Sequence, residues 1–323
     1  MDPALERLVY GAGSTAPCGA NGQYVSGAPP CTFDHAAFKK LTSQYGFAVA
    51  PMAMYPARTT GFGGFQIAVQ AAFTSIANDA DYWQKGTRGS PDPNTGLYPA
   101  KNTDPDGRLG LYGVSVRKGL PFGFELGVSV GYLAHTSIFS GGADLRASLL
   151  EGFRTGVLGI LPDLSVGIGI RTITGTPQFK LTVGTADLVL SKPIAVGGIS
   201  VLTPTVGYQF VRIYADSGPI DGTPNTDPLA ACNYQGQNDR GQPICGAGGT
   251  AADFNNTQVF DNARINRHRL VLGVHYRYEI LVVGAQFVTD LVAPKDANDG
   301  ATAQALDGVP RQNTIAVELG ATF

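Results

Sequence analysis

The sequence predicts an all-β fold, an antiparallel up-and-down β-barrel of about ten strands, and three observations lead to it. Apolar side chains recur at every second position through most of the chain after residue 63. Because side chains alternate across a strand, this period gives each predicted strand one apolar face. The opposite faces are dominated by Gly, Ala, Ser, Thr and Gln, with occasional charges. The connections alternate between short and long, so the longest loops gather at one end of the predicted barrel.

Composition narrows the class of protein. Of 323 residues, 43 are glycine and only 15% are charged. Glycine without a collagen period, in a chain of alternating segments, favours a glycine-rich β protein over a disordered one. The net charge of -2 provides no basic footprint for nucleic acid. No run approaches the roughly 20 apolar residues of a membrane-spanning helix, whereas a strand of a membrane barrel needs only about 9–11.

The composition of the polar faces indicates whether the apolar faces contact lipid or the core of a soluble protein. In a soluble β-sandwich the polar face looks at water and is rich in Lys, Glu and Thr. Here the small and uncharged residues of that face suit a confined interior better. A transmembrane barrel turns an apolar band to lipid and alternates short turns with longer loops. We therefore predict a transmembrane barrel, and a secreted all-β sandwich is the structural alternative.

The N-terminal segment, residues 1–60, is expected to lie outside the barrel wall, either as an appendage or as a plug that folds into the lumen. Asp34 has the character of an N-cap for a short helix near 35–43, which Gly46 would stop. Prolines interrupt the extended run that follows, so this run is not expected to be a regular strand.

The barrel is predicted over residues 61–323. Its strands are expected at about 65–74, 109–118, 122–132, 144–149, 164–171, 177–190, 199–214, 267–278, 283–288 and 314–323. The long loops are expected at 77–108, 215–262 and 292–310. If residues 44–58 and one loop each contributed a strand, the count would be twelve.

The sixth strand carries a specific expectation. Phe179, Leu181 and Val183 are expected to point outward, and the pattern changes face near Gly184, as a β-bulge would cause.

The last strand ends the chain on an aromatic residue, and Ile315, Val317, Leu319, Ala321 and Phe323 share its apolar face. This stretch resembles the closing strand of Gram-negative outer-membrane β-barrel proteins of the porin-like and small-barrel class. In that family the last residue is typically Phe and is part of the assembly signal. The resemblance covers about 63–323, at the level of architecture.

This resemblance implies a location and partners. We expect an outer-membrane protein in contact with outer-membrane lipid, whose C-terminal strand the barrel-assembly machinery recognises, with other envelope proteins as further partners. The long loops would be extracellular, and an appendage formed by residues 1–60 would be periplasmic. Met1–Arg7 has no apolar signal region, so we expect the printed chain to be the processed form. The aromatic girdle of such a barrel is expected to include Phe122, Tyr132, Tyr276, Tyr278 and Phe323.

The four cysteines form two local pairs, Cys18 with Cys31 and Cys232 with Cys245. Three pairings exist formally. The nearest-neighbour pairing closes two short loops, and in an oxidising compartment each bridge would contribute roughly 3 kcal/mol. The alternative, a four-cysteine zinc site, usually needs closely spaced cysteine knuckles, which are absent from the sequence.

Catalytic motifs are scarce. No Walker loop, dinucleotide glycine motif, H-E-x-x-H motif or cysteine knuckle occurs, so neither a cofactor nor a metal site is expected. His135 and His268 are predicted near the mouth with the long loops, and Asp290 could join them. A carboxylate–histidine pair there would permit water activation, as in omptin-like barrel proteases, and this is the minor enzyme alternative. We expect no enzyme.

Charged residues on the inward faces are the main candidates for function. They are Arg117, Glu125, Asp144, Arg146, Arg171, Arg267, Arg269, His275, Arg277 and Glu318. They would line a narrow porin-like channel for small solutes, because rings of charge set selectivity. Alternatively they pair across a filled lumen, and the barrel is a non-conducting scaffold or anchor of a cell-envelope complex. Ten strands lie close to the size at which side chains fill the interior.

Overall fold

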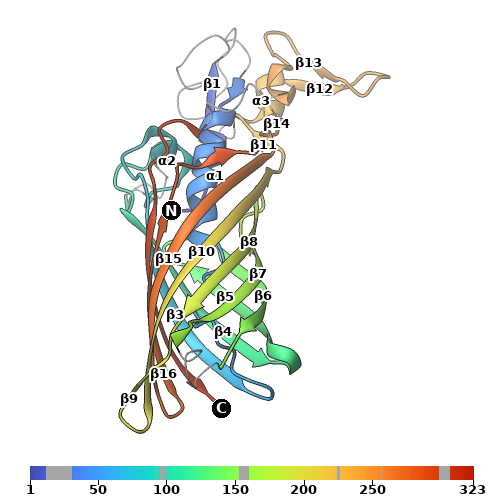
Figure 1. Cartoon of the computed structure of the whole chain (residues 1–323). Helices are drawn as coiled ribbons and strands as arrows, with labels where there is room; N and C mark the ends of the chain where they lie inside the picture. The colour runs from blue at the N-terminus through green and yellow to red at the C-terminus, as the bar shows by residue number, and fades with distance from the viewer. Residues whose placement is uncertain are drawn as a thin grey trace.

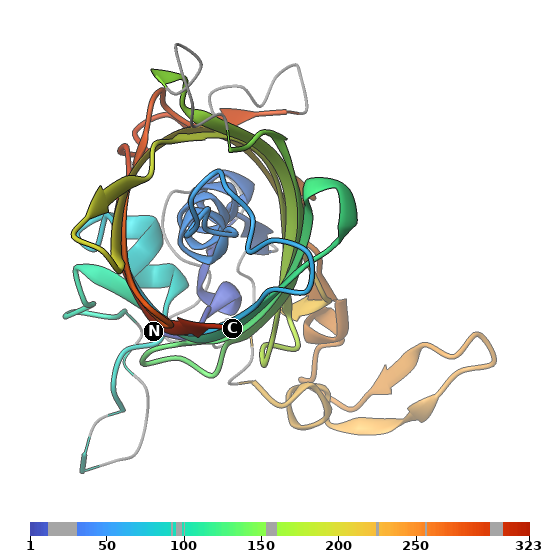
Figure 2. The same ribbon diagram turned by 60° about the horizontal axis from the view of Figure 1, so that its bottom comes forward.

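The computed structural model describes residues 1–11, 31–91, 93–94, 99, 101–152, 160–223, 226–255, 257–297 and 306–323. Within this part of the chain, ten strands close into an antiparallel barrel, which confirms the predicted fold class (Figures 1 and 2). They are β3 (Phe65–Ser75), β4 (Arg108–Gly119), β5 (Phe124–Leu133), β6 (Phe139–Leu150), β7 (Asp163–Thr174), β8 (Phe179–Ser191), β10 (Ser200–Ser217), β15 (Ala263–Tyr278), β16 (Leu281–Asp290) and β18 (Asn313–Thr322).

The barrel closes where β18 pairs with β3, from Thr314 opposite Thr74 to Thr322 opposite Gln66. Two short strands extend the sheet without entering the ring: β9 (Ile194–Val196) on β10 and β17 (Lys295–Asp296) on β15. With these two the sheet has twelve strands, but residues 44–58 do not supply one of them, because they form a helix end and an extended run inside the barrel.

The two ends of the barrel differ. At the short-turn end lie the connections 120–123, 151–162, 192–199 and 279–280, together with the C-terminus. At the long-loop end lie 134–138, 175–178 and the three longest connections, 76–107, 218–262 and 291–312. The third strand begins at Phe124 and not at Phe122 as expected. The reason is that Phe122 has a φ of 61° in the turn η3 (Pro121–Gly123), which is incompatible with a strand.

The outside of the wall is apolar. Side chains of Leu319, Val130 and Ile168 are 52%, 61% and 60% exposed on the strands. The five aromatic residues expected in the girdle are all exposed: Phe122, Tyr132, Tyr276, Tyr278 and Phe323. Large apolar side chains left on a surface in this way mark contact with an apolar environment. None of the helices in the described residues has the length and hydropathy of a membrane-spanning helix.

The helix α1 (His35–Val49) lies inside the barrel (Figure 2). The Asp34 side chain accepts a hydrogen bond from the Ala37 N–H at 2.9 Å, as the N-cap expectation required. The helix passes Gly46, where it was expected to stop, and ends at Val49. A Cβ at Gly46 would lie 2.5 Å from Ile213 on the wall, so this glycine permits close packing and does not serve as a C-cap.

The expectation for the sixth strand is wrong. In β8, Phe179, Leu181 and Val183 are buried and point inward, and its ladders with β7 and β10 have no register shift. The reason is α1, whose Phe38 and Tyr45 rings pack on Phe179, with centroids 6.2 and 5.7 Å apart. Near the long loops, this face of α1 and the facing strand β8 therefore form an apolar contact inside the barrel.

Short elements cover the long-loop end. They are η1 (Leu5–Arg7), β1 (Val9–Gly11), β2 (Cys31–Phe33), α2 (Asp81–Gly86), β11 (Ile220–Asp221), η5 (Ala252–Asn255) and β14 (Thr257–Gln258). Trp83 of α2 is fully buried and stacks on Tyr45 of α1 at 5.0 Å, which ties this cover to the lumen helix.

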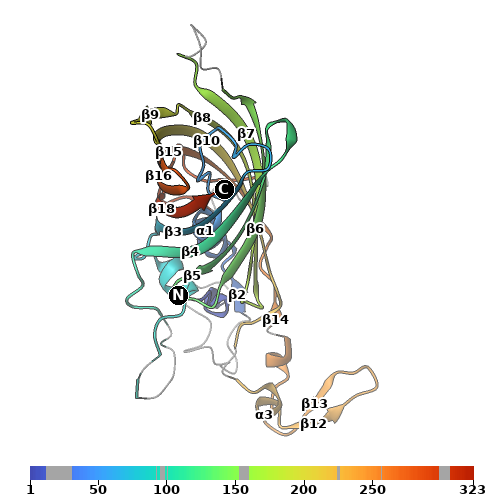
Figure 3. The same cartoon turned by 90° about the horizontal axis from the view of Figure 1, so that it is seen from below.

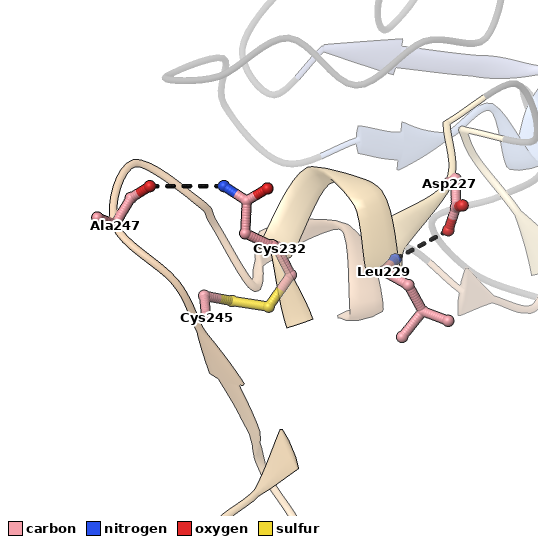
Figure 4. Close-up of a disulfide and its surroundings, with 6 residues drawn as sticks. Asp227, Leu229, Cys232, Cys245 and Ala247 are labelled. Atoms are coloured by element: carbon pink, nitrogen blue, oxygen red, sulfur yellow. Dashed lines mark hydrogen bonds between the residues drawn. A yellow bond between two sulfur atoms is a disulfide. The ribbon is translucent and has the colours of Figure 1, made fainter. Parts of the chain in front are cut away.

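The connection between β10 and β15 carries a projecting lobe, formed by α3 (Pro228–Cys232), β12 (Tyr234–Gln237) and β13 (Pro243–Cys245) (Figure 3). A disulfide joins Cys232 to Cys245, as predicted (Figure 4). Cys18 lies outside the described residues, so its bridge to Cys31 stays a prediction.

Candidate functional site

The C-terminal end of α1 is held by arginines of the wall. A helix end leaves its last carbonyls without helical partners and carries partial negative charge. Arg269 of β15 donates to the Phe47 carbonyl at 3.2 Å. Arg171 of β7 donates to the Val49 carbonyl at 3.3 Å. The barrel thus supplies both the donors and the positive charge that this helix end requires.

The same arrangement continues along the extended run after α1. Donors of the wall reach successive backbone carbonyls of this run, and the pairs are Arg269 with Pro51, Gln209 with Pro51, Gln286 with Ala53 and Arg146 with Pro56. Backbone without secondary structure needs such partners when it is buried. Residues 43–60, which we call the lumen segment, are therefore bound along their length by the interior of the barrel.

Arg267 is a fully buried anchor of this segment. Its guanidinium forms an ion pair with Asp290 and also donates to the Gln312 side chain at 2.5 Å and to the Ser43 carbonyl at 2.8 Å. The guanidinium carbon lies 4.5 Å from the centroid of the Phe47 ring. Arg267 and Asp290 have no exposed side-chain surface, so each depends on the other for its charge.

A second ion pair lies nearer the short-turn end, where Arg146 pairs with Glu125. The guanidinium carbon of Arg146 lies 4.0 Å from the centroid of the Tyr55 ring, and the Glu125 carboxylate accepts from the Thr60 N–H at 2.8 Å. Tyr55 donates to the Asp187 carboxylate at 3.2 Å. These contacts hold the C-terminal half of the lumen segment in place.

A cavity of about 350 Å³ lies beside this group, between the lumen segment and the ends of the strands at the short-turn end of the barrel. We call it the vestibule. His275 and Glu318 line it, and both are 3% exposed. Neither ring nitrogen of His275 nor Oε1 of Glu318 has a hydrogen-bond partner among the described residues. His275 Nε2 and Glu318 Oε1 are 3.6 Å apart.

The structure places the sequence-predicted inward charges as follows. Eight are buried: Arg117, Glu125, Arg146, Arg171, Arg267, Arg269, His275 and Glu318. Asp144 is half-buried, and Arg277 is exposed at the end of β15. Sequence reasoning missed the roles of Tyr55, Asp187 and Gln312. Asp187 could have been found, because strict alternation through residues 179–191 puts it on the same face as Phe179.

The rim histidines do not meet one another. His135 Nδ1 lies 2.7 Å from Asp106 Oδ2 on an exposed loop. His268 lies on the outward face of β15 and hydrogen-bonds Tyr208 at 2.5 Å, whereas Asp290 is buried on the inward side with Arg267. The expected grouping of His135, His268 and Asp290 is therefore not formed. Among the described residues, no group of three or more His, Cys, Asp or Glu side chains is placed to hold a metal ion.

Comparisons with known proteins give no residue roles. Neither a protein-family model nor a curated protein sequence matches the chain. Three solved structures are similar. The transport unit of the autotransporter AIDA-I from Escherichia coli is 10% identical, with 90% of this chain and 98% of that chain covered and a TM-score of 0.34. The outer membrane protease OmpT from Escherichia coli is 9% identical, covering 80% and 95%, with a TM-score of 0.31. Neisserial surface protein A is 9% identical, covering 81% and 99%, with a TM-score of 0.29.

Proposed function

We infer that this chain, which has the fold of outer-membrane β-barrel proteins, is a porin-like barrel whose own lumen segment keeps it closed at rest. Small solutes would pass only when this segment is displaced. One observation carries the proposal: buried donors of the wall bind the backbone carbonyls of residues 43–56 one after another.

The exterior supports a membrane location. Every backbone group of a spanning segment must find an internal partner in lipid, and a closed barrel meets this demand without a sheet edge. The large exposed side chains along the wall are mostly apolar, and they include Phe323 at the short-turn end. By analogy with barrels of this class, the short-turn end would face the periplasm and the long loops would face outward.

The interior supports a closed state. Ten strands enclose little more than side chains can fill, and here α1 and the run after it occupy that space as well. The described interior retains the vestibule of about 350 Å³ and a second cavity of about 20 Å³. The second is large enough for a water molecule and too small for a solute.

A non-conducting scaffold is the second candidate function. The disulfide-closed lobe favours it, because α3, β12 and β13 project away from the barrel and expose Leu229, Tyr234 and Ile244. Such a lobe would present a surface to another envelope protein.

Single-channel recording in planar bilayers separates the two functions. The wild-type protein should show few openings. Arg269→Met removes the donors to Phe47 and Pro51 and should raise the open probability several-fold. Arg264→Met, at an exposed position on the same strand, is the matched control and should behave as the wild type. Silence of both wild type and Arg269→Met would favour the scaffold. A steadily open wild-type channel would contradict closure by the lumen segment.

A further inference from the structure

The vestibule contains polar atoms that nothing in the described structure satisfies. Burying a polar group without a partner costs roughly 1–3 kcal/mol, and more for a charged group. His275 leaves both ring nitrogens unpaired, Glu318 leaves Oε1 unpaired and Arg146 leaves its Nε–H unpaired. All three side chains are more than nine-tenths buried and line the same cavity. This concentration of unpaired groups points to a ligand.

The backbone makes room for this arrangement. A Cβ added to Gly284 would lie 2.7 Å from Glu318 Cγ and 2.8 Å from His275 Cδ2. Both side chains therefore rest directly on the backbone of β16, where only a glycine leaves enough space. His275 and Glu318 are held side by side from the two neighbouring strands, β15 and β18.

The charges of the vestibule have two signs. Glu318 offers a carboxylate oxygen that needs a donor. Arg146 Nε offers a buried donor that needs an acceptor, and the exposed Arg277, at the end of β15, adds positive charge to the same cavity. A simple anion would leave Glu318 Oε1 without a donor, and a simple cation would leave Arg146 Nε without an acceptor. A solute that carries both charges would satisfy both groups at once.

We propose that the vestibule binds a small zwitterion of the amino-acid or short-peptide class. Its ammonium would donate to Glu318 Oε1 and to the unprotonated nitrogen of His275. Its carboxylate would accept from Arg146 Nε and Arg277. The volume of about 350 Å³ lies at the lower end of the range for small-molecule pockets, so the solute is small. The vestibule is formed with the lumen segment in place, so the site does not require that segment to move.

Isothermal titration calorimetry on the full chain in detergent micelles tests the site with three matched probes. They are L-alanyl-L-alanine, its N-acetyl derivative, which lacks the ammonium, and its C-terminal amide, which lacks the carboxylate. The zwitterion should bind at least tenfold more tightly than either blocked form. Equal binding of all three, no binding of the dipeptide at 10 mM, or tighter binding of a neutral disaccharide would overturn the proposal.

Two variants test which side chain binds the ammonium of the ligand and which binds its carboxylate. Glu318→Gln should weaken binding of the dipeptide and its amide at least tenfold and leave the N-acetyl form unchanged. Arg277→Gln should weaken the dipeptide and the N-acetyl form and leave the amide unchanged. Because Arg277 is exposed, this variant should fold even where Glu318→Gln does not. Asp106→Asn, at the opposite rim, is the control and should change none of the affinities. Equal losses for all three probes in Arg277→Gln would contradict the assignment.

Binding in micelles is also independent of conductance. If the protein binds the dipeptide but never conducts, the binding site is supported and the proposed channel function is wrong. If the protein conducts but does not bind the dipeptide, the channel function is supported and the proposed site is wrong.

Discussion

Lys39 Nζ lies 2.8 Å from Asp296 Oδ2, and the two side chains are only 3% and 0% exposed. Lys39 belongs to α1 and Asp296 to β17, which pairs with the upper part of β15. The pair therefore joins the lumen helix to the long-loop end of the wall, whereas the arginines hold its other end. The helix is fixed at both ends by charges that have little contact with water.

Replacing Asp296 with Asn should loosen the upper end of α1. Removing one partner of a buried ion pair leaves the other charge uncompensated, at a cost on the order of 3 kcal/mol. Trp83 reports the change, since it is the single tryptophan of the chain and stacks on Tyr45 of α1. The urea midpoint followed by Trp83 fluorescence should fall. The variant Asp239→Asn, with an exposed carboxylate in the projecting lobe, should leave this midpoint in place. Equal midpoints for Asp296→Asn and wild type would show that the pair does not hold the helix.

Gly46→Ala should destabilise the packing of α1 on the wall. The new Cβ would meet Ile213 at 2.5–2.7 Å, and overpacking of this kind typically costs about 1–3 kcal/mol. Thermal unfolding followed by Trp83 fluorescence measures the effect. Gly141→Ala is the matched control, because nothing lies within 4 Å of a Cβ there, and its change should stay within about 0.5 kcal/mol. A larger effect for Gly141→Ala than for Gly46→Ala would exclude close packing at Gly46 as the reason for this glycine.

The burial of Tyr82 of α2 should become unfavourable in strong alkali. Burial raises the pKa of Tyr82 to about 12, whereas an unfolded tyrosine titrates near ~10. The folded state therefore holds the phenol proton more tightly, and its contribution to stability is complete below pH ~10. This contribution is lost as the pH rises towards 12, when the hydroxyl that accepts from Gln44 ionises. Trp83 unfolding midpoints should fall across this range in wild type and fall less in Tyr82→Phe. Parallel curves for the two proteins would refute the assignment.

Reduction of the disulfide should act locally. The bridge between Cys232 and Cys245 closes a short loop of the projecting lobe and contributes roughly 3 kcal/mol to its order. In the double variant Cys232→Ser/Cys245→Ser, amide exchange should accelerate over residues 228–245 and stay unchanged in the barrel strands. Accelerated exchange in β10 or β15 would mean that the lobe stabilises the wall, against this expectation.

The alternation of side chains predicted the barrel well, because lipid outside and a closed interior impose a period of two on every strand. On β18, Leu319 is exposed and Ala316 is buried, as this rule requires. The rule fails at Phe179, because apolarity alone cannot tell a lipid-facing side chain from one that packs on a helix inside the barrel. It fails at Phe122 because the turn requires a positive φ at this residue, and a phenylalanine in the sequence does not predict one.

The inward charges of the site could be predicted, but their partners could not. The face of Arg267, Arg269 and Arg171 follows from strand alternation. Their acceptors are backbone carbonyls, such as those of Phe47 and Val49, and carbonyls have no sequence signature. For the same reason the pattern left open whether these arginines face water or a segment of the chain.

Amide hydrogen exchange over residues 43–53, measured on the protein in lipid vesicles, tests the central claim most directly. If the wall holds this segment inside the closed lumen, its amides should exchange as slowly as those of the barrel strands, and Arg269→Met should accelerate them selectively. Exchange as fast as that of the exposed lobe, in the wild-type protein, would contradict a lumen closed by its own N-terminal segment.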